Sequence, residues 1–100
     1  ESAEQDILYL MAQKWAADLE ESFGSRGMAA ELRASCDNLN KRIRSLYWDD
    51  GRKLFSDTPG HDQFSQHANV LAVLADVSTG DEARELIGRI LNNKELIQCS

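Results

Sequence analysis

Apolar side chains recur every three or four residues along the first half of the chain, which is the period of an α-helix. Between residues 3 and 23 the apolar positions are Ile7, Leu8, Met11, Trp15, Leu19 and Phe23. Gly24 follows them where a helix C-cap is expected. A narrower apolar stripe with charged flanks crosses residues 28–47. The Gly-Ser-Arg-Gly connection is short, so the sequence predicts an antiparallel helical hairpin.

A long polar connection follows this hairpin. It reads Asp-Asp-Gly-Arg-Lys-Leu-Phe-Ser-Asp-Thr-Pro-Gly-His-Asp and starts after Trp48. Its Asp-Gly and Pro-Gly pairs are typical of turns. We expect Leu54 and Phe55 to be briefly extended inside it. Asp62 stands where it would cap the helix that begins near Phe64.

The remaining pattern predicts two more helices, over residues 64–77 and 81–92. Apolar residues surround nearly the whole of the first, and its polar residues cluster in its first turns. Such a helix needs neighbours on most sides. The second has one apolar face, and Thr79 with Glu82 has the spacing of a capping box at its start.

These elements predict an all-α fold of two antiparallel αα-hairpins. The inner helices, 3–23 and 64–77, would face each other, and the outer helices, 28–47 and 81–92, would face solvent. The alternation of short, long and short connections agrees with a double ring of helices. The long loop then lies at the N-terminal end of an inner helix.

Size and charge narrow the class of protein. One hundred residues form one domain at most. The net charge of −6 disfavours nucleic acid and anionic membranes as partners, and no apolar run reaches the roughly 20 residues that a membrane helix needs.

Cys36 lies in phase with the apolar stripe and is expected to be a buried free thiol, while Cys99 has no evident role. Because the chain begins at Glu1 without a leader, we expect it to be a piece of a larger protein, and its localisation stays open.

Residues 47–77 carry a resemblance to a known family. The matching pieces are an aromatic-Trp-Asp at 47–49, an aromatic-x-Asp at 55–57, and Ser-Gln-His-Ala-Asn at 65–69, which is followed by Leu-Ala-Val-Leu. This segment resembles the C-terminal half of the catalytic barrel in bacterial α-L-rhamnosidases of glycoside hydrolase family 78. The Ser-Gln-His-Ala-Asn motif is the specific part, and the flanking helices fit the family's rhythm.

The resemblance implies an (α/α)6 barrel, with six inner and six outer helices and an active site at the N-terminal ends of the inner ones. This chain, residues 1–100, would supply two of the six pairs. The family hydrolyses with inversion, in which one carboxylic acid protonates the leaving oxygen and a second carboxylate activates water. Because the family's acid and base lie before and after this stretch, we assign no catalytic residue here and expect the chain alone to be inactive.

Three residues are candidates for substrate binding. His67 would contact a sugar hydroxyl or support the pocket floor, or else it is a buried histidine that bonds a carbonyl or a neighbour. Asp57 would hold a sugar hydroxyl, or else it caps its own turn. Gln66 is the third candidate. Because Gln66 and Asn69 point to different sides of the helix, at least one of them should bond to another helix.

The other chemical residues receive structural interpretations. We expect His61 to be a solvated loop residue and Trp48 to pack in the core instead of serving as a sugar platform. The two histidines with Asp57 and Asp62 do not have the spacing of metal ligands. We therefore predict no metal and no cofactor.

The sequence thus favours part of a glycoside hydrolase that removes terminal α-L-rhamnose from glycans or glycosides. Two alternatives stay open: a free-standing helical interaction module, and a barrel glycosidase of other sugar specificity. Four of twelve barrel helices cannot close a ring. We therefore expect apolar side chains such as Val70, Val73 and Val77 to stay exposed, and the chain to form a homodimer through helix 3–23 or 64–77.

Overall fold

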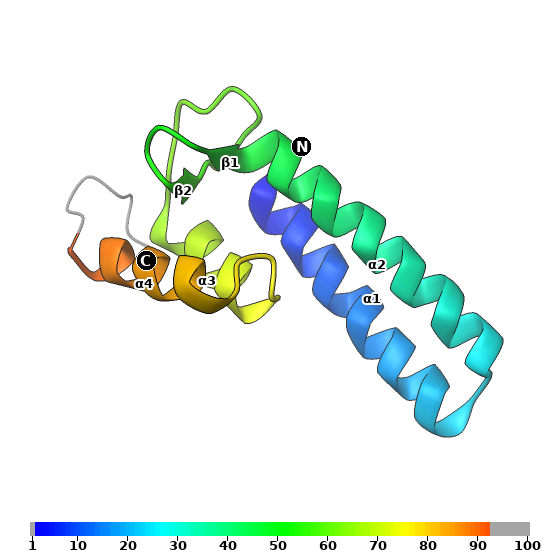
Figure 1. The fold of residues 1–100 in the computed structure, drawn as a ribbon. Helices are drawn as coiled ribbons and strands as arrows, with labels where there is room; N and C mark the ends of the chain where they lie inside the picture. Colours follow the sequence, from blue (N-terminus) through cyan, green and yellow to red (C-terminus); the bar gives the residue numbers. More distant parts are fainter. Residues whose placement is uncertain (1, 93–100) are drawn as a thin grey trace.

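The computed structural model describes residues 2–92 and is predominantly helical, which confirms the all-α class. Its elements in this range are α1 (Ala3–Phe23), α2 (Arg26–Tyr47), β1 (Trp48–Asp49), β2 (Leu54–Phe55), α3 (Gln66–Leu74) and α4 (Gly80–Asn92). Helices α1 and α2 form a long hairpin, and the strands, α3 and α4 lie against one end of it (Figure 1). Across residues 2–92 we find no helix with the length and hydropathy needed to span a bilayer.

The α1–α2 hairpin forms as predicted because each end has a suitable cap. Ser2 caps α1 by accepting from the Gln5 N–H at 3.2 Å. Gly24 ends α1 and donates its N–H to the Glu20 carbonyl at 3.0 Å. Ser25 then caps α2 by accepting from the Met28 N–H, so α2 begins two residues before the predicted range.

Two short strands follow α2 and hold the start of the long loop. They are antiparallel, with Trp48 opposite Phe55 and Asp49 opposite Leu54. Leu54 and Phe55 are both buried, which confirms the extended pair predicted within the loop. Trp48 meets the Phe55 ring edge to face at 4.9 Å and packs against the core, as expected.

Helix α3 is shorter than the predicted range 64–77 at both ends. Its N-cap is Ser65, whose hydroxyl accepts from the Ala68 N–H at 3.2 Å. The prediction of Asp62 as the cap is therefore wrong, and that residue accepts a hydrogen bond from Thr58 in the loop. The helix ends because Asp76 adopts a left-handed conformation, φ 60°, which aspartate tolerates better than most residues.

Helix α4 returns antiparallel to α3 and completes the second hairpin. Gln66 at the start of α3 donates to the Ile90 carbonyl near the end of α4, so at least one of the two polar residues of the motif bonds to another helix, as predicted. Glu82, expected in a capping box with Thr79, accepts from the Ser78 hydroxyl and pairs with Arg44 of α2 at 2.8 and 2.9 Å.

The core lies where the two hairpins and the strands meet. Its largest fully buried apolar side chains are Ile7, Leu10, Ile43, Tyr47, Phe55 and Leu86. Cys36 is a buried free thiol, as predicted, and its burial raises the pKa of that thiol. Cys99 lies outside the described residues.

Part of the apolar surface stays uncovered. On α3, Val70 is 41% and Leu74 is 64% exposed, whereas Val77 is buried, so the expectation that Val77 stays exposed is wrong. Val73 is partly buried against the core. On α1 the face away from α2 and α3 is also apolar and exposed, from Leu8 to Phe23.

Candidate functional site

The N-terminal end of α3 is tied to the long loop by Asn69. This side chain is fully buried. Its Oδ1 accepts from the Phe55 N–H at 2.7 Å, and its Nδ2 donates to the Phe55 carbonyl at 3.0 Å. The same nitrogen donates to the Ser65 carbonyl at 2.8 Å, one turn back on the helix. The loop therefore cannot move relative to the first turns of α3 without breaking buried hydrogen bonds.

Asp57 holds the same end from inside the loop. Its Oδ1 accepts from the Ser65 hydroxyl at 2.7 Å. Its backbone N–H donates to the Gln63 carbonyl at 2.7 Å, and its carbonyl accepts from the Ala3 N–H at 2.9 Å. These bonds place Asp57 where the loop, α1 and α3 meet. They correspond to the structural alternative for this residue, that of organising its own turn and the neighbouring cap.

His67 lies in the first turn of α3, in the position that the sequence predicted. Its Nε2 is 3.2 Å from Oε1 of Glu4, in the first turn of α1, and its side chain is 40% exposed. The ring bonds a neighbour, as the structural alternative expected, but it is only partly buried. The pair joins the N-terminal ends of α1 and α3, and one part of the ring still faces solvent.

Gln66, the neighbouring candidate, turns toward α4. Its Nε2 donates to the Ile90 carbonyl at 3.3 Å, and the side chain is half-buried. His67 and Gln66 thus leave α3 in different directions. The structure brings His67 and Asp57 to one end of α1 and α3, but it gives Gln66 a contact between helices.

The ring of His61 contacts two other residues of the chain, so the prediction that it is a solvated loop residue is wrong. Its Nδ1 lies 3.1 Å from Oδ2 of Asp49, and its Nε2 lies 2.9 Å from the Leu46 carbonyl. Each acceptor faces one ring nitrogen, and a carbonyl oxygen or an ionised carboxylate can only accept, so a contact is a hydrogen bond when the facing nitrogen carries the hydrogen. The turn at Pro59-Gly60 and the left-handed φ of His61, 56°, direct the ring back onto α2.

Asp49 has a second partner that affects its charge. The Arg52 N–H donates to Asp49 Oδ1 at 2.9 Å, and this bond, followed by the bond from His61, lowers the pKa of the Asp49 carboxyl. The carboxylate therefore stays ionised at neutral pH and serves as a fixed acceptor for the loop. Local spacing alone would have revealed Arg52 as a partner but not His61, twelve residues away.

Two cavities lined by described residues lie away from this end of the molecule. One cavity of about 550 Å³ lies at the far end of the α1–α2 hairpin, and another of about 390 Å³ lies beside the Arg44–Glu82 pair. Neither is lined by His67, Gln66 or Asp57. Among residues 2–92, no three histidine, cysteine, aspartate or glutamate side chains are grouped closely enough to hold a metal ion.

The described residues at this end can position polar groups, and their carboxylates have partners within the chain. Of the carboxylates at this end, Asp57 bonds Ser65, Asp62 bonds Thr58, and Glu4 pairs with His67. The chemistry of this end is that of a binding or positioning surface. In comparisons with protein-family models, curated proteins and solved structures, this chain has no match.

Proposed function

We propose that this chain is part of the catalytic barrel of a glycoside hydrolase that resembles the family-78 α-L-rhamnosidases and removes terminal α-L-rhamnose with inversion. The observation that carries the proposal is the position of the Ser-Gln-His-Ala-Asn motif. It opens α3, at the end of the molecule where the long loop and the first turn of α1 also lie. In an (α/α)6 barrel this is the side on which the substrate binds.

The directions of the helices support the same assignment. Glu4 and His67 contact each other from the first turns of α1 and α3, and the Ala3 N–H bonds the loop at Asp57. Two inner helices of such a barrel would begin at the same side. We therefore assign α1 and α3 to the inner ring and α2 and α4 to the outer ring. The exposed apolar residues of α1 and α3 would then face further helices of the ring.

The three candidate residues take different roles in this proposal. His67 is the one we assign to contact the sugar, because its ring is partly exposed while Glu4 fixes its orientation. Asp57 shapes the loop beside it through Ser65. Gln66 fixes α3 against α4 and acts at a distance from the sugar.

The reaction itself needs two carboxylates on opposite faces of the sugar, one as general acid and one as general base. We assign neither to this chain. The acid and the base would come from other parts of the polypeptide, and the described residues would bind and orient the rhamnosyl group. No metal or cofactor is needed for this chemistry.

The experiment compares this chain with the longest polypeptide that contains it. The chain should not hydrolyse an aryl α-L-rhamnoside. The longer polypeptide should hydrolyse it and release the inverted sugar, which NMR of the anomeric proton detects. There, His67→Ala should lower kcat/KM by at least about tenfold, as expected for a lost polar contact to the substrate, while Asn38→Ala on the exposed side of α2 should not change it.

Two outcomes would overturn the proposal. One is turnover by this chain that disappears in Asp57→Asn, because the catalytic carboxylate would then lie here. The other is a longer polypeptide that is inactive on a panel of aryl glycosides. Activity on a different sugar would keep the barrel and replace rhamnose with that sugar.

The exposed apolar face of α1 favours a second candidate, a helical interaction module. The sequence on both sides of this chain separates the two. Acidic motifs on each side support the hydrolase, whereas a gene that starts and stops near residues 1 and 100 supports the module.

A further inference from the structure

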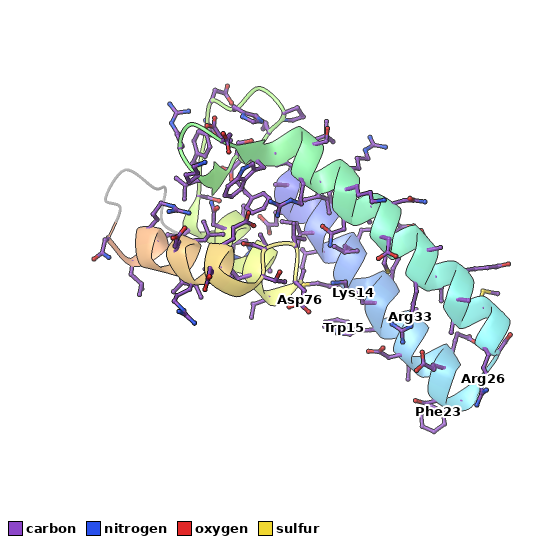
Figure 2. The ribbon with its side chains drawn as sticks, in the orientation of Figure 1. Lys14, Trp15, Phe23, Arg26, Arg33 and Asp76 are labelled. Carbon is purple, nitrogen blue, oxygen red and sulfur yellow. The ribbon has the colours of Figure 1, made fainter. Side chains whose placement is uncertain are left out.

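One face of α1 is apolar along most of its length and is largely exposed. It comprises Leu8, Ala12, Trp15, Ala16, Leu19 and Phe23, which we name the α1 stripe. Trp15 is 62% exposed and Phe23 is 88% exposed. Figure 2 shows both on the outer side of the hairpin, Phe23 at its far end. A continuous row of exposed apolar side chains often marks a surface that binds another protein.

The spacing of the α1 stripe is symmetric. Its steps along the chain are four, three, one, three and four residues, so the row reads the same from either end. The centre lies between Trp15 and Ala16. A two-fold rotation about that point places Leu8 on Phe23, and Ala12 on Leu19. In each pair a large side chain therefore meets another member of the row. A face that matches itself after a two-fold rotation suits a second copy of the same chain, whereas an unrelated partner would not need a symmetric row.

Charges along the edges agree with an antiparallel pairing in this register. Asp18 falls opposite Gln13 of the second copy, and Glu20 falls opposite Met11 of the second copy, so like charges do not meet. Glu4 approaches the far end of the other hairpin, where Arg26 lies beside Phe23 (Figure 2). The α1 stripe itself carries no charged residue.

The area of the α1 stripe is sufficient for a modest dimer. Four large side chains exposed by about half or more offer on the order of 500 Å² per copy. Side chains along the edges bring the contact toward the roughly 800 Å² per partner of a standard interface. We propose that a second copy of this chain occupies the α1 stripe, with the two α1 helices antiparallel about Trp15 and Ala16.

Association is the first test. Sedimentation from micromolar to submillimolar concentration should show a mass about twice the 11.2 kDa of one chain. Trp15→Glu should weaken the dimer about 100-fold, because it removes a central aromatic from both copies. The control is Leu91→Glu on α4, since Leu91 is also an exposed apolar residue, at 77%, and lies on a helix other than α1. It should change the dissociation constant by less than about threefold, and circular dichroism should show helix retained in both variants.

Cross-linking tests the register. In a background of Cys36→Ala and Cys99→Ser, a mixture of Leu8→Cys and Phe23→Cys variants should form a disulfide between the two on mild oxidation. Neither variant should link to itself, because two copies of residue 8 would lie roughly 22 Å apart along the helix axis, far beyond disulfide reach.

Three results would overturn the proposal: a monomer at all concentrations, equal effects of the Trp15 and Leu91 substitutions, or self-linking of the Leu8→Cys variant, which indicates parallel helices. A monomer that binds a different protein through Trp15 would assign the α1 stripe to that partner. In the longer polypeptide of the proposed barrel a neighbouring helix would cover the α1 stripe, so the dimer is proposed for this chain by itself. The hydrolase assays use the longer polypeptide, so they can fail while this chain forms the dimer.

Discussion

The side chain of Asn69 bonds both backbone groups of Phe55, accepting from its N–H at 2.7 Å and donating to its carbonyl at 3.0 Å. A neighbouring strand would make the same two bonds to β2. The buried amide therefore substitutes for a third strand, and it does so from the first turns of a helix. This relationship makes the loop and α3 one structural unit.

Asn69→Ala should lower the free energy of unfolding by about 3 kcal/mol. The substitution leaves the N–H and carbonyl of Phe55 buried without partners, and each such group costs about 1–3 kcal/mol. Urea unfolding followed by circular dichroism measures the change. Asn38→Ala, on the exposed side of α2, should stay within about 0.5 kcal/mol of wild type. A loss that small in Asn69→Ala would show that the loop does not depend on this amide.

The Arg44–Glu82 pair should make stability depend on acidity. The hydrogen bonds from Arg44 are the main cause that lowers the pKa of Glu82 below its ordinary value of 4.5, with a further contribution from Ser78. The unfolded chain therefore binds this proton at higher pH than the folded chain does. The contribution to stability is present above about pH 4.5 and is lost as the pH falls through the folded pKa.

Comparison of wild type with Glu82→Gln measures this contribution. At pH 7 the variant should be less stable by about 1 kcal/mol, a modest value because both partners are about one-third exposed. The difference should shrink between pH 4.5 and pH 2, since wild type then loses the charge as well. Glu85→Gln, on the exposed face of α4, should show no such trend. A difference that grows toward low pH would reverse the sign and contradict the assignment.

Two glycines of α4 should respond to alanine in opposite directions. Gly80 has φ 61°, and a Cβ there would meet no atom within 4 Å, so Gly80→Ala should cost about 1 kcal/mol through backbone strain alone. Gly88 lies inside the helix, also with open space around it, so Gly88→Ala should stabilise by about 0.5–1 kcal/mol. Thermal unfolding of both variants tests this. Equal signs would contradict the left-handed start of α4.

Replacing each histidine by alanine should affect stability to different degrees, because His61 has a structural role and His67 is proposed to bind the sugar. His61→Ala should lower the unfolding free energy by about 1–2 kcal/mol, because the polar contacts of its ring with Asp49 and with the Leu46 carbonyl are lost. His67→Ala should cost at most about 0.5 kcal/mol, since its ring and its partner Glu4 are both exposed. Urea titrations of the two variants give the order. The reverse order would remove His67 from the proposed sugar-binding surface.

Elements that depend on neighbours in sequence could be predicted. The hairpin of α1 and α2 follows from the apolar period and from Gly24, and the buried pair Leu54 and Phe55 follows from the turns around it. The cap of α3 was misplaced because Asp62 and Ser65 are both good capping residues. The choice depends on Asp57, which bonds the Ser65 hydroxyl and orients it.

Features set by distant partners could not be predicted. Helix α3 stops early while Lys14, 61 residues away, donates to the Ala75 carbonyl, and Arg44, 33 residues away, donates to the Val77 carbonyl. His61 likewise finds its acceptors on α2 only after the loop has folded back. The sequence identified His67 by its motif and helical position, and its contact with Glu4 required the packing of α1 against α3. The sugar-binding role of His67 stays a prediction.

The long hairpin described above is unevenly anchored. Between Ala17 on α1 and Ala29 on α2 none of the described residues is buried, and the helices are joined there by exposed pairs of Arg33 with Asp18 and Glu21. Backbone amides should therefore exchange with deuterated solvent fastest at this end and progressively more slowly toward the strands. Pairing across the α1 stripe places the loosely held end of one copy against the firmly held start of the other, so association and local opening would be directly linked.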